Sequence, residues 1–398
     1  MRRILSIVFI CTLVLSLASG CAQDEAPGQP DVTPGVTQES TGESLSIVST
    51  IFPQYDWVRE ILGEKASNMD LTLLISSAVD LHSFNPSISD IATIATADLF
   101  IYVGGHSDDW VEGALRQATN PNIVVINLME VLGDGAKLEE IIEGMQHDHH
   151  DCDDDDCDHD HDHHDCDDDD CDHDHHDCDD DDCDHDHHDC DDDDCDHDHH
   201  DCDDHDGDDD DCGHDHHHHG ESDEHVWLSL RNAVVFCHAI ADALSALDPV
   251  NADYYAANLA AYVEKLLSLD EEYRAALGNI ENKTLLFADR FPFRYLADDY
   301  GINYYAAFSG CSAETEASFS TIIFLAGKVD ELGLSTVMIT ESGNRAIAET
   351  VISNTETKDQ QILELDSMQS ITTADVQRGV TFLSIMESNL AVLVEVLK

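Results

Sequence analysis

Two histidines and two acidic residues occupy positions where the side chains of a folded α/β protein could meet. His82 follows a predicted strand at 71–75, and His225 stands where a helical stretch begins. Asp366 comes directly after another predicted strand, and Glu341 follows a further one by two residues. In open α/β sheets the binding crevice lies beyond the carboxyl ends of the strands. Imidazole and carboxylate groups bind transition metals, so the four residues are candidate ligands of one ion, although either histidine alone would more simply be a solvated loop residue.

A low-complexity tract at 147–224 holds a much higher density of potential ligands. Its 78 residues include 42 of the 86 acidic residues, 22 of the 26 histidines and 10 of the 14 cysteines, but no Lys or Arg. Cysteines recur every 12 residues, at Cys166, Cys178, Cys190 and Cys202. The tract has almost no apolar residue, so we expect a disordered, metal-binding insertion without a core. A merely solubilising spacer would need neither histidine nor cysteine at this density, and zinc is the ion that best suits such mixed ligands.

The charge of the chain argues against some classes of partner. There are 86 acidic and 17 basic residues, which gives a formal charge of −69 at pH 7. Such a balance repels phosphate groups and anionic lipid head groups. We therefore expect no nucleic-acid partner and no electrostatic docking to a membrane.

The N-terminus predicts an exported protein on a lipid anchor. Residues 1–20 read as a lipoprotein signal peptide, with two arginines, an apolar run and small residues before Cys21. We expect lipidation of Cys21, and the alternative is a plain signal peptide that is cleaved nearby. Residues 21–45 are rich in Pro, Gly, Ser, Thr and acids, which predicts a disordered tether. The expected location is extracytoplasmic, lipid-anchored to the cell membrane.

The remaining residues show short apolar runs that alternate with amphipathic stretches. In the first half this pattern predicts strands at 46–51, 71–75, 99–103 and 123–126, with helices near 53–62, 89–95 and 109–117. In the second half it predicts strands at 284–287, 304–307, 336–339 and 362–365, with helices near 291–298, 317–331 and 373–397. Between the halves, 228–247 and 251–277 have helical apolar spacing. Such alternation indicates parallel sheets covered by helices.

We therefore predict an α/β fold with two lobes, each a parallel sheet flanked by helices, which one long rigid helix joins, plus a disordered insertion. The predicted N-terminal lobe comprises 46–146 and 225–250, the insertion 147–224, the interlobe helix 251–278 and the C-terminal lobe 279–398. At the α-helical rise per residue, the long helix would span roughly 40 Å and reach from one lobe to the other.

The sequence resembles the zinc/manganese solute-binding lipoproteins of ABC importers across nearly all of 45–398. The matching stretches are DLHSFNP at 80–86, EHVWL at 224–228, the segment 309–318 and Leu365-Asp366, and the long helix and the His-rich insertion match as well. The resemblance implies a metal ion held between two lobes by three histidines and one carboxylate, with His82, His225 and Asp366 at three of these positions. It also implies a monomeric binding protein that is not an enzyme. The implied partners are the metal ion, an ABC permease with its ATPase, and the membrane through the N-terminal lipid.

The position of the third histidine departs from this pattern, because Arg290 stands there. A guanidinium stays protonated and has no lone pair, so it cannot bind a metal ion. Three arrangements remain open: Glu341 coordinates the ion, Cys311 or His106 reaches it, or water takes the fourth position. We favour Glu341, because its carboxylate would also offset the charge of Arg290. In an alternative arrangement Arg290 pairs with Asp366 or Glu341 and holds that carboxylate in place.

Some of the remaining histidines and cysteines have simpler interpretations. Cys311 would otherwise be a small buried apolar residue, and His106 a polar loop residue. Cys237 and His238 fall within a helical apolar pattern and are interpreted as packing residues.

Together these features predict an extracytoplasmic zinc-binding component of an ABC importer, which captures the ion between two lobes and delivers it to the permease. Mn²⁺ is the less favoured ion, because the thiol and imidazole groups of the tract suit zinc better. One alternative is a surface metal buffer that acts through the tract alone. Another is a zinc hydrolase, which the absence of His-Glu-x-x-His and Gly-x-Ser-x-Gly motifs disfavours.

Overall fold

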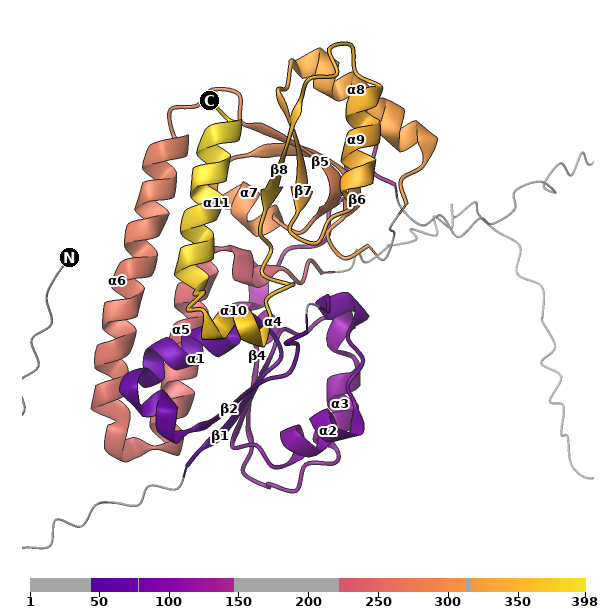
Figure 1. Ribbon diagram of the computed structural model, residues 1–398. Helices are drawn as coiled ribbons and strands as arrows, with labels where there is room; N and C mark the ends of the chain where they lie inside the picture. The colour runs from indigo at the N-terminus through magenta and orange to yellow at the C-terminus, as the bar shows by residue number, and fades with distance from the viewer. Residues whose placement is uncertain (1–43, 78, 147–221, 313–315) are drawn as a thin grey trace, which may run out of the picture. The chain divides into compact units, whose positions relative to one another are not determined.

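The computed structural model describes residues 44–77, 79–146, 222–312 and 316–398 (Figure 1). The predicted signal peptide, Cys21, and nearly all of the predicted tether and insertion lie outside these residues. The described part of the chain contains two parallel four-stranded sheets with helices beside them. This arrangement confirms the predicted α/β fold.

The first sheet comes from the N-terminal half of the chain, and its strand order is β2-β1-β3-β4. All of its neighbouring strands run parallel. The strands are β1 (Ser46–Ser49), β2 (Asp70–Leu73), β3 (Leu99–Tyr102) and β4 (Val124–Asn127). The helices of this half are α1 (Phe52–Leu62), α2 (Ile88–Ala95), α3 (Trp110–Leu115) and α4 (Leu128–Leu132). Strand β3 is a run of large apolar and aromatic residues that is buried along most of its length, as expected for the inside of a parallel sheet.

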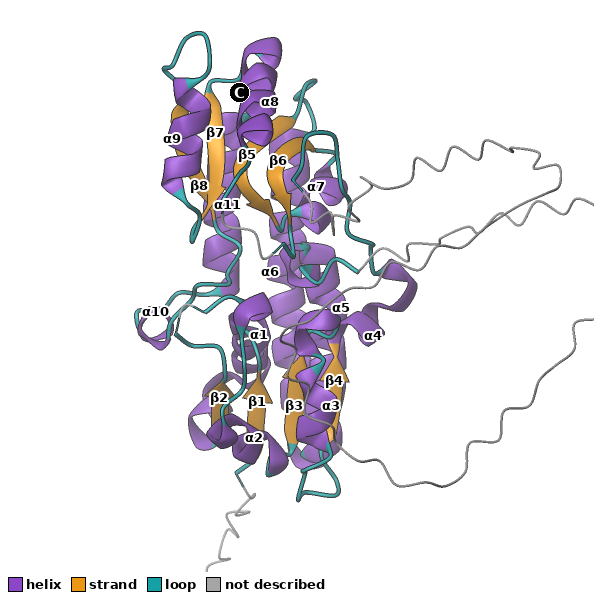
Figure 2. Ribbon diagram, turned by 90° about the vertical axis from the view of Figure 1, so that its right-hand side faces the viewer, coloured by secondary structure: helices purple, strands orange, loops and turns teal. Residues whose placement is uncertain are grey.

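The second sheet comes from the C-terminal half and has the order β6-β5-β7-β8 (Figure 2). Its strands are also parallel. They are β5 (Thr284–Phe291), β6 (Asn303–Ser309), β7 (Thr336–Thr340) and β8 (Gln361–Leu365). The helices of this half are α7 (Arg294–Tyr300), α8 (Phe319–Leu332), α9 (Arg345–Ser353), α10 (Thr373–Gln377) and α11 (Phe382–Val396).

The C-terminal half differs from the sequence prediction in three elements. Strand β5 continues to Phe291, past an irregularity in its pairing with β6. The single helix predicted at 373–397 is two helices, because Gly379 adopts φ +87° after α10 and Thr381 caps the start of α11. Helix α9 was not predicted.

Helices α5 (Leu230–Leu247) and α6 (Ala252–Leu277) connect the two halves. Helix α6 packs against α1 and α5, and also against α7 and α11 of the C-terminal half. Its buried apolar and aromatic residues recur at helical spacing, at Tyr255, Leu259, Tyr262, Leu266, Leu269, Tyr273 and Leu277. One hydrophobic cluster includes residues of β1, β3, α6 and β5, so a continuous core joins both halves.

Among the described residues, α5 is the one helix that is long and apolar enough to span a membrane. It packs against α1, α4 and α6, and seven of its residues belong to the buried core. These contacts identify α5 as a core helix.

Candidate metal site

His82 lies in a short turn beyond the end of β2, and an acidic residue starts this turn. The Asp80 carboxylate accepts a hydrogen bond from the backbone N–H of His82 at 2.9 Å. Leu81, the residue between Asp80 and His82, is buried in the core and anchors the loop. His82 lies in the middle of a 3₁₀ turn over Leu81–Ser83, and its backbone is held by the bond to Asp80 and by the buried Leu81.

His225 is completely buried, and its orientation is set by Asp223. One Asp223 carboxylate oxygen accepts hydrogen bonds from the backbone N–H and from Nδ1 of His225, both at 2.9 Å. With Nδ1 occupied, Nε2 points the other way, and it lies 3.2 Å from Nε2 of His82. Gly310 makes room for this ring, because a Cβ there would lie 3.1 Å from it.

The second nitrogen of His82 is also occupied. Its Nδ1 lies 2.7 Å from Ser107 Oγ and 3.4 Å from a carboxylate oxygen of Glu224. The other oxygen of Glu224 accepts the backbone N–H of Ser107 at 2.9 Å. Burial by itself lowers the pKa of His82, but the hydrogen bond with Glu224 and the charge of Asp80 outweigh it, so the net pKa is raised. The pKa of Glu224 is lowered although burial acts to raise it, because of its bonds with His82 and Ser107.

Cys311 completes the group from the C-terminal half. One ring nitrogen of His82, one of His225 and the sulfur of Cys311 all lie within 4.8 Å of one another. In the part of the chain that the structure describes, no other group of three His, Cys, Asp or Glu residues meets this criterion. The backbone N–H of Cys311 donates to the Glu139 carboxylate at 2.7 Å. Burial, together with the Glu139 charge, raises the pKa of the Cys311 thiol, so binding of a metal ion would displace its proton.

The spacing of the two histidine nitrogens suits a tetrahedral metal. Two nitrogens at about 2.0–2.1 Å from zinc, separated by the tetrahedral angle, lie about 3.3 Å from each other. The observed separation of 3.2 Å between the two Nε2 atoms is close to this value. A sulfur at about 2.3 Å from the same ion would lie about 3.5 Å from each nitrogen, so Cys311 is within a small movement of that position.

A cavity of about 490 Å³ gives access to this group. Its lining residues come from the loops described above and are His82, Gly105, His106, Ser107, Ser222, Glu224 and Cys311. Of these residues, His106 is largely exposed and pairs with Asp109 at 2.7 Å. The cavity therefore connects solvent with His82 and Cys311.

Asp366 and Glu341 form an acidic pair that does not belong to the group of His82, His225 and Cys311. The Trp227 indole links the two places: its ring centroid lies 5.2 Å from that of His225, and its N–H donates to the carbonyl of Ser367. Glu341 accepts hydrogen bonds from the loop that follows Asp366, at Ser367 N, Ser367 Oγ, Gln369 N and Ser370 Oγ. Burial and the charge of Glu341 raise the pKa of Asp366 to about 7.

Arg290 contacts the loop that carries His82 and the loop that carries Cys311. It pairs with Asp80 at 2.9 Å, and it donates to the carbonyl of Ser312 at 3.4 Å. Of the two residues interpreted as packing, Cys237 is buried as predicted, whereas His238 is exposed on α5.

Several residues that support the site were not singled out from the sequence. Asp223 and Glu224 directly precede His225, and this proximity was the available signal for both. Ser107 and Glu139 lie far from the histidines along the chain. Only the fold brings them to His82 and Cys311.

A family model described as "zinc-uptake complex component A, periplasmic" (ZnuA) matches residues 47–396. The high-affinity zinc uptake system protein ZnuA of Bacillus subtilis is 25% identical over 383 residues, which cover 96% of this chain and 94% of that protein. The zinc-binding lipoprotein AdcA of Streptococcus pneumoniae is 26% identical over 358 residues, which cover 89% of this chain and 56% of AdcA. The chain thus spans just over half the length of the streptococcal relatives that it matches. The crystal structure of the Zn(II)-bound ZnuA-like domain of that AdcA is similar in fold, with a TM-score of 0.57, 23% identity, and 89% and 99% of the two chains covered.

Proposed function

The chain belongs to the family of zinc-uptake complex component A, and we propose that it captures a zinc ion between its two halves with His82, His225 and Cys311 and passes it to an ABC permease. Members of this family bind the transported ion and are not enzymes. The ion is therefore cargo that the site must hold and later release.

The observation that carries this proposal is the convergence of three ligand atoms from distant parts of the chain. The two Nε2 atoms are 3.2 Å apart, and the Cys311 sulfur lies within 4.8 Å of a ring nitrogen of each histidine. Both Nδ1 atoms face oxygen atoms of neighbouring side chains, which leaves the Nε2 lone pairs for the ion. In this proposal Cys311 supplies the ligand that Arg290 cannot supply.

The donor set favours zinc over manganese. Thiolate and imidazole ligands suit zinc, whereas Mn²⁺ prefers sites made of oxygen ligands. Two nitrogens and one sulfur therefore support zinc as the cargo of this site, in agreement with the names of the relatives.

We propose Asp366 as the fourth ligand, and a supporting role for Glu341. Asp366 follows β8, and its loop touches the same Trp227 that contacts His225. Both oxygens of Glu341 already accept hydrogen bonds from the 367–370 loop. These bonds favour Glu341 as the residue that holds the Asp366 loop in shape.

The family and the N-terminal sequence support a proposal for the partners and the location. We propose that the mature chain is a monomer, tethered outside the cytoplasm by a lipid on Cys21, and that it delivers zinc to a permease driven by an ATPase. The tract at 147–224 would collect zinc near the site, with weaker affinity than the preformed group. These roles rest on the sequence and on the printed descriptions of relatives.

A zinc titration of the full chain in competition with a chelator tests the proposed ligands. Cys311→Ser should weaken the tightest zinc equivalent at least tenfold, because a hydroxyl is a much poorer zinc ligand than a thiolate. Cys237→Ala is the matched control, since it removes a buried thiol that lies in α5. Equal affinity in the two variants would refute the role of Cys311. Unchanged affinity in His82→Ala and His225→Ala would refute the site, and would leave the tract as a metal buffer.

A further inference from the structure

Arg290 lies between the two loops that carry ligands of the proposed site and contacts both of them. It stands near the end of β5, where the pairing with β6 is irregular between Phe287 and Arg290. Its guanidinium pairs with Asp80 of the N-terminal half at 2.9 Å and donates to the Ser312 carbonyl of the C-terminal half at 3.4 Å. The side chain of Arg290 is 23% exposed and that of Asp80 is 15% exposed, so water screens this pair less than a surface ion pair.

In the N-terminal half, the Asp80 carboxylate connects Arg290 with the proposed ligand His82. Asp80 uses Oδ1 to accept the backbone N–H of His82, and uses Oδ2 for the pair with Arg290. Movement of Arg290 away from Asp80 would remove one of the two contacts that hold this carboxylate at the start of the His82 turn.

In the C-terminal half, the main chain at Ser312 connects Arg290 with the proposed ligand Cys311. Ser312, whose carbonyl accepts from Arg290, is the residue after Cys311. The Cys311 N–H donates a hydrogen bond to the Glu139 carboxylate. The main chain at Cys311 and Ser312 is thus held by Glu139 at the Cys311 N–H and by Arg290 at the Ser312 carbonyl.

We propose that Arg290 is a positioning residue that clamps the His82 loop to the Cys311 loop and thereby sets the rate at which the site releases zinc. This inference rests on the proposed function, because it assigns a role to Arg290 in the same site. Arg290 does not touch the ion. It keeps His82 and Cys311 close to each other, and opening of the Arg290–Asp80 pair separates these two ligands.

The test measures zinc release from the zinc-loaded full chain after mixing with an excess of a chromogenic chelator. The slow phase with an amplitude of one ion per chain is assigned to the site by its loss in His225→Ala. Arg290→Ala and Asp80→Asn should each accelerate this phase at least tenfold, with a smaller change in the rate of zinc binding. The Asp80→Asn variant keeps an oxygen for the His82 N–H. The double variant should release zinc no faster than the faster single variant, because both changes break one contact.

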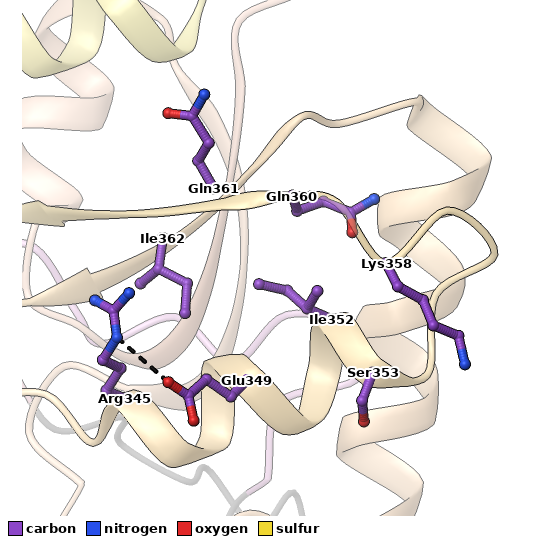
Figure 3. A pocket seen from close by; sticks show the side chains of 8 residues that line it. All are labelled: Arg345, Glu349, Ile352, Ser353, Lys358, Gln360, Gln361 and Ile362. Carbon is purple, nitrogen blue, oxygen red and sulfur yellow. Dashed lines mark ion pairs between the residues drawn. The ribbon is translucent and has the colours of Figure 1, made fainter.

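The matched control is Arg345→Ala, which removes the same type of charge from the C-terminal half. Arg345 lines a pocket between α9 and β8 and pairs with Glu349 on its own helix at 3.4 Å (Figure 3). Its release rate should equal that of the unmodified chain. Arg290→Lys should be intermediate, because an ammonium keeps the charge but lacks the planar fork that can bind two partners.

Two results would overturn the clamp. Release that is unchanged or slower in Arg290→Ala and in Asp80→Asn, with the slow phase intact, would show that the guanidinium merely repels the cation or has no role. A chain without any slow phase, or one whose slow phase persists in His225→Ala, would refute the proposed site and the clamp with it. Asp80→Asn keeps the test decisive if Arg290→Ala does not fold.

Discussion

At the scale of single residues, the site is defined by acceptors on the far side of each imidazole. Asp223 holds Nδ1 of His225, and Ser107 and Glu224 face Nδ1 of His82. These contacts favour the tautomer with the proton on Nδ1, so both Nε2 atoms present lone pairs toward each other. A cation bound by both lone pairs would bridge the two Nε2 atoms, which lie 3.2 Å apart.

Glu224→Gln should weaken zinc binding about tenfold or more, as is typical when the carboxylate behind a metal-binding histidine is lost. The amide carries no charge, so it makes the His82 ring a weaker base and a weaker ligand. Competition titration with a chelator measures this change. Asp109→Asn is the control, because Asp109 also pairs with a histidine, the exposed His106. Similar losses in both variants would contradict the role given to Glu224.

A buried carboxyl away from the site predicts how stability depends on pH. Burial raises the pKa of Asp56 to about 6, although the Phe382 N–H, at 2.8 Å, and Arg59 act to lower it. A raised folded-state pKa means that the folded chain binds this proton more tightly than the unfolded chain. The stabilisation is therefore complete below about pH 4 and is lost as the pH rises to about 6.

Asp56→Asn should remove this loss. Between pH 4 and pH 7 the stability of the original chain should fall relative to the variant by up to about 3 kcal/mol, which corresponds to a shift of roughly two pKa units. Thermal unfolding at several pH values measures the difference. Asp242→Asn, an exposed change on α5, should show no such trend. A difference that is constant over this range would contradict the assignment.

At the scale of elements, the sequence predicted the strands better than the ends of the helices. Short apolar runs such as the one in β3 are typical of strands that are buried in a parallel sheet, and this pattern predicted them. The break between α10 and α11 depends on Gly379 and Thr381, whose local effects the apolar spacing does not reveal. The extension of β5 to Phe291 depends on pairing with β6, which is a tertiary contact.

The long helix α6 offers a sharp test of the core, because neighbouring leucines have opposite environments. Leu266 is fully buried, whereas Leu267 is 48% exposed, although both fit the apolar spacing of the sequence. Leu266→Ala should destabilise the chain by about 2–5 kcal/mol, because it leaves a cavity between helices. Leu267→Ala should cost much less. Equal shifts in the thermal unfolding temperature would show that α6 does not pack as described.

At the scale of the whole molecule, the sequence could place each histidine in a loop but could not show which side chains converge. His82 and His225 were predicted from their positions next to elements and from a family resemblance. The proximity of Cys311 to them depends on how β6 and its following loop face the first sheet, and on Glu139, which no local pattern connects to Cys311. The convergence of loops from two sheets is a property of the packed core, and the sequence alone left Cys311 as one of several alternatives.

Deletion of 147–219 distinguishes zinc binding at the proposed site from zinc binding by the tract. The shortened chain should retain about one tightly bound zinc ion, because the residues of the proposed site lie outside the deleted segment. It should lose the weaker zinc equivalents, because the deleted segment holds 22 of the 26 histidines and 10 of the 14 cysteines. Elemental analysis and chelator competition measure both quantities. Loss of nearly all bound zinc would instead favour a metal buffer.

The central claim is that one ion is shared by His82, His225 and Cys311. Anomalous scattering at the zinc edge, from crystals of the zinc-loaded full chain, tests it most directly. We predict a peak at about 2.0–2.1 Å from both Nε2 atoms and about 2.3 Å from the Cys311 sulfur. A zinc peak bound without Cys311, or no peak near the two histidines, would contradict the account.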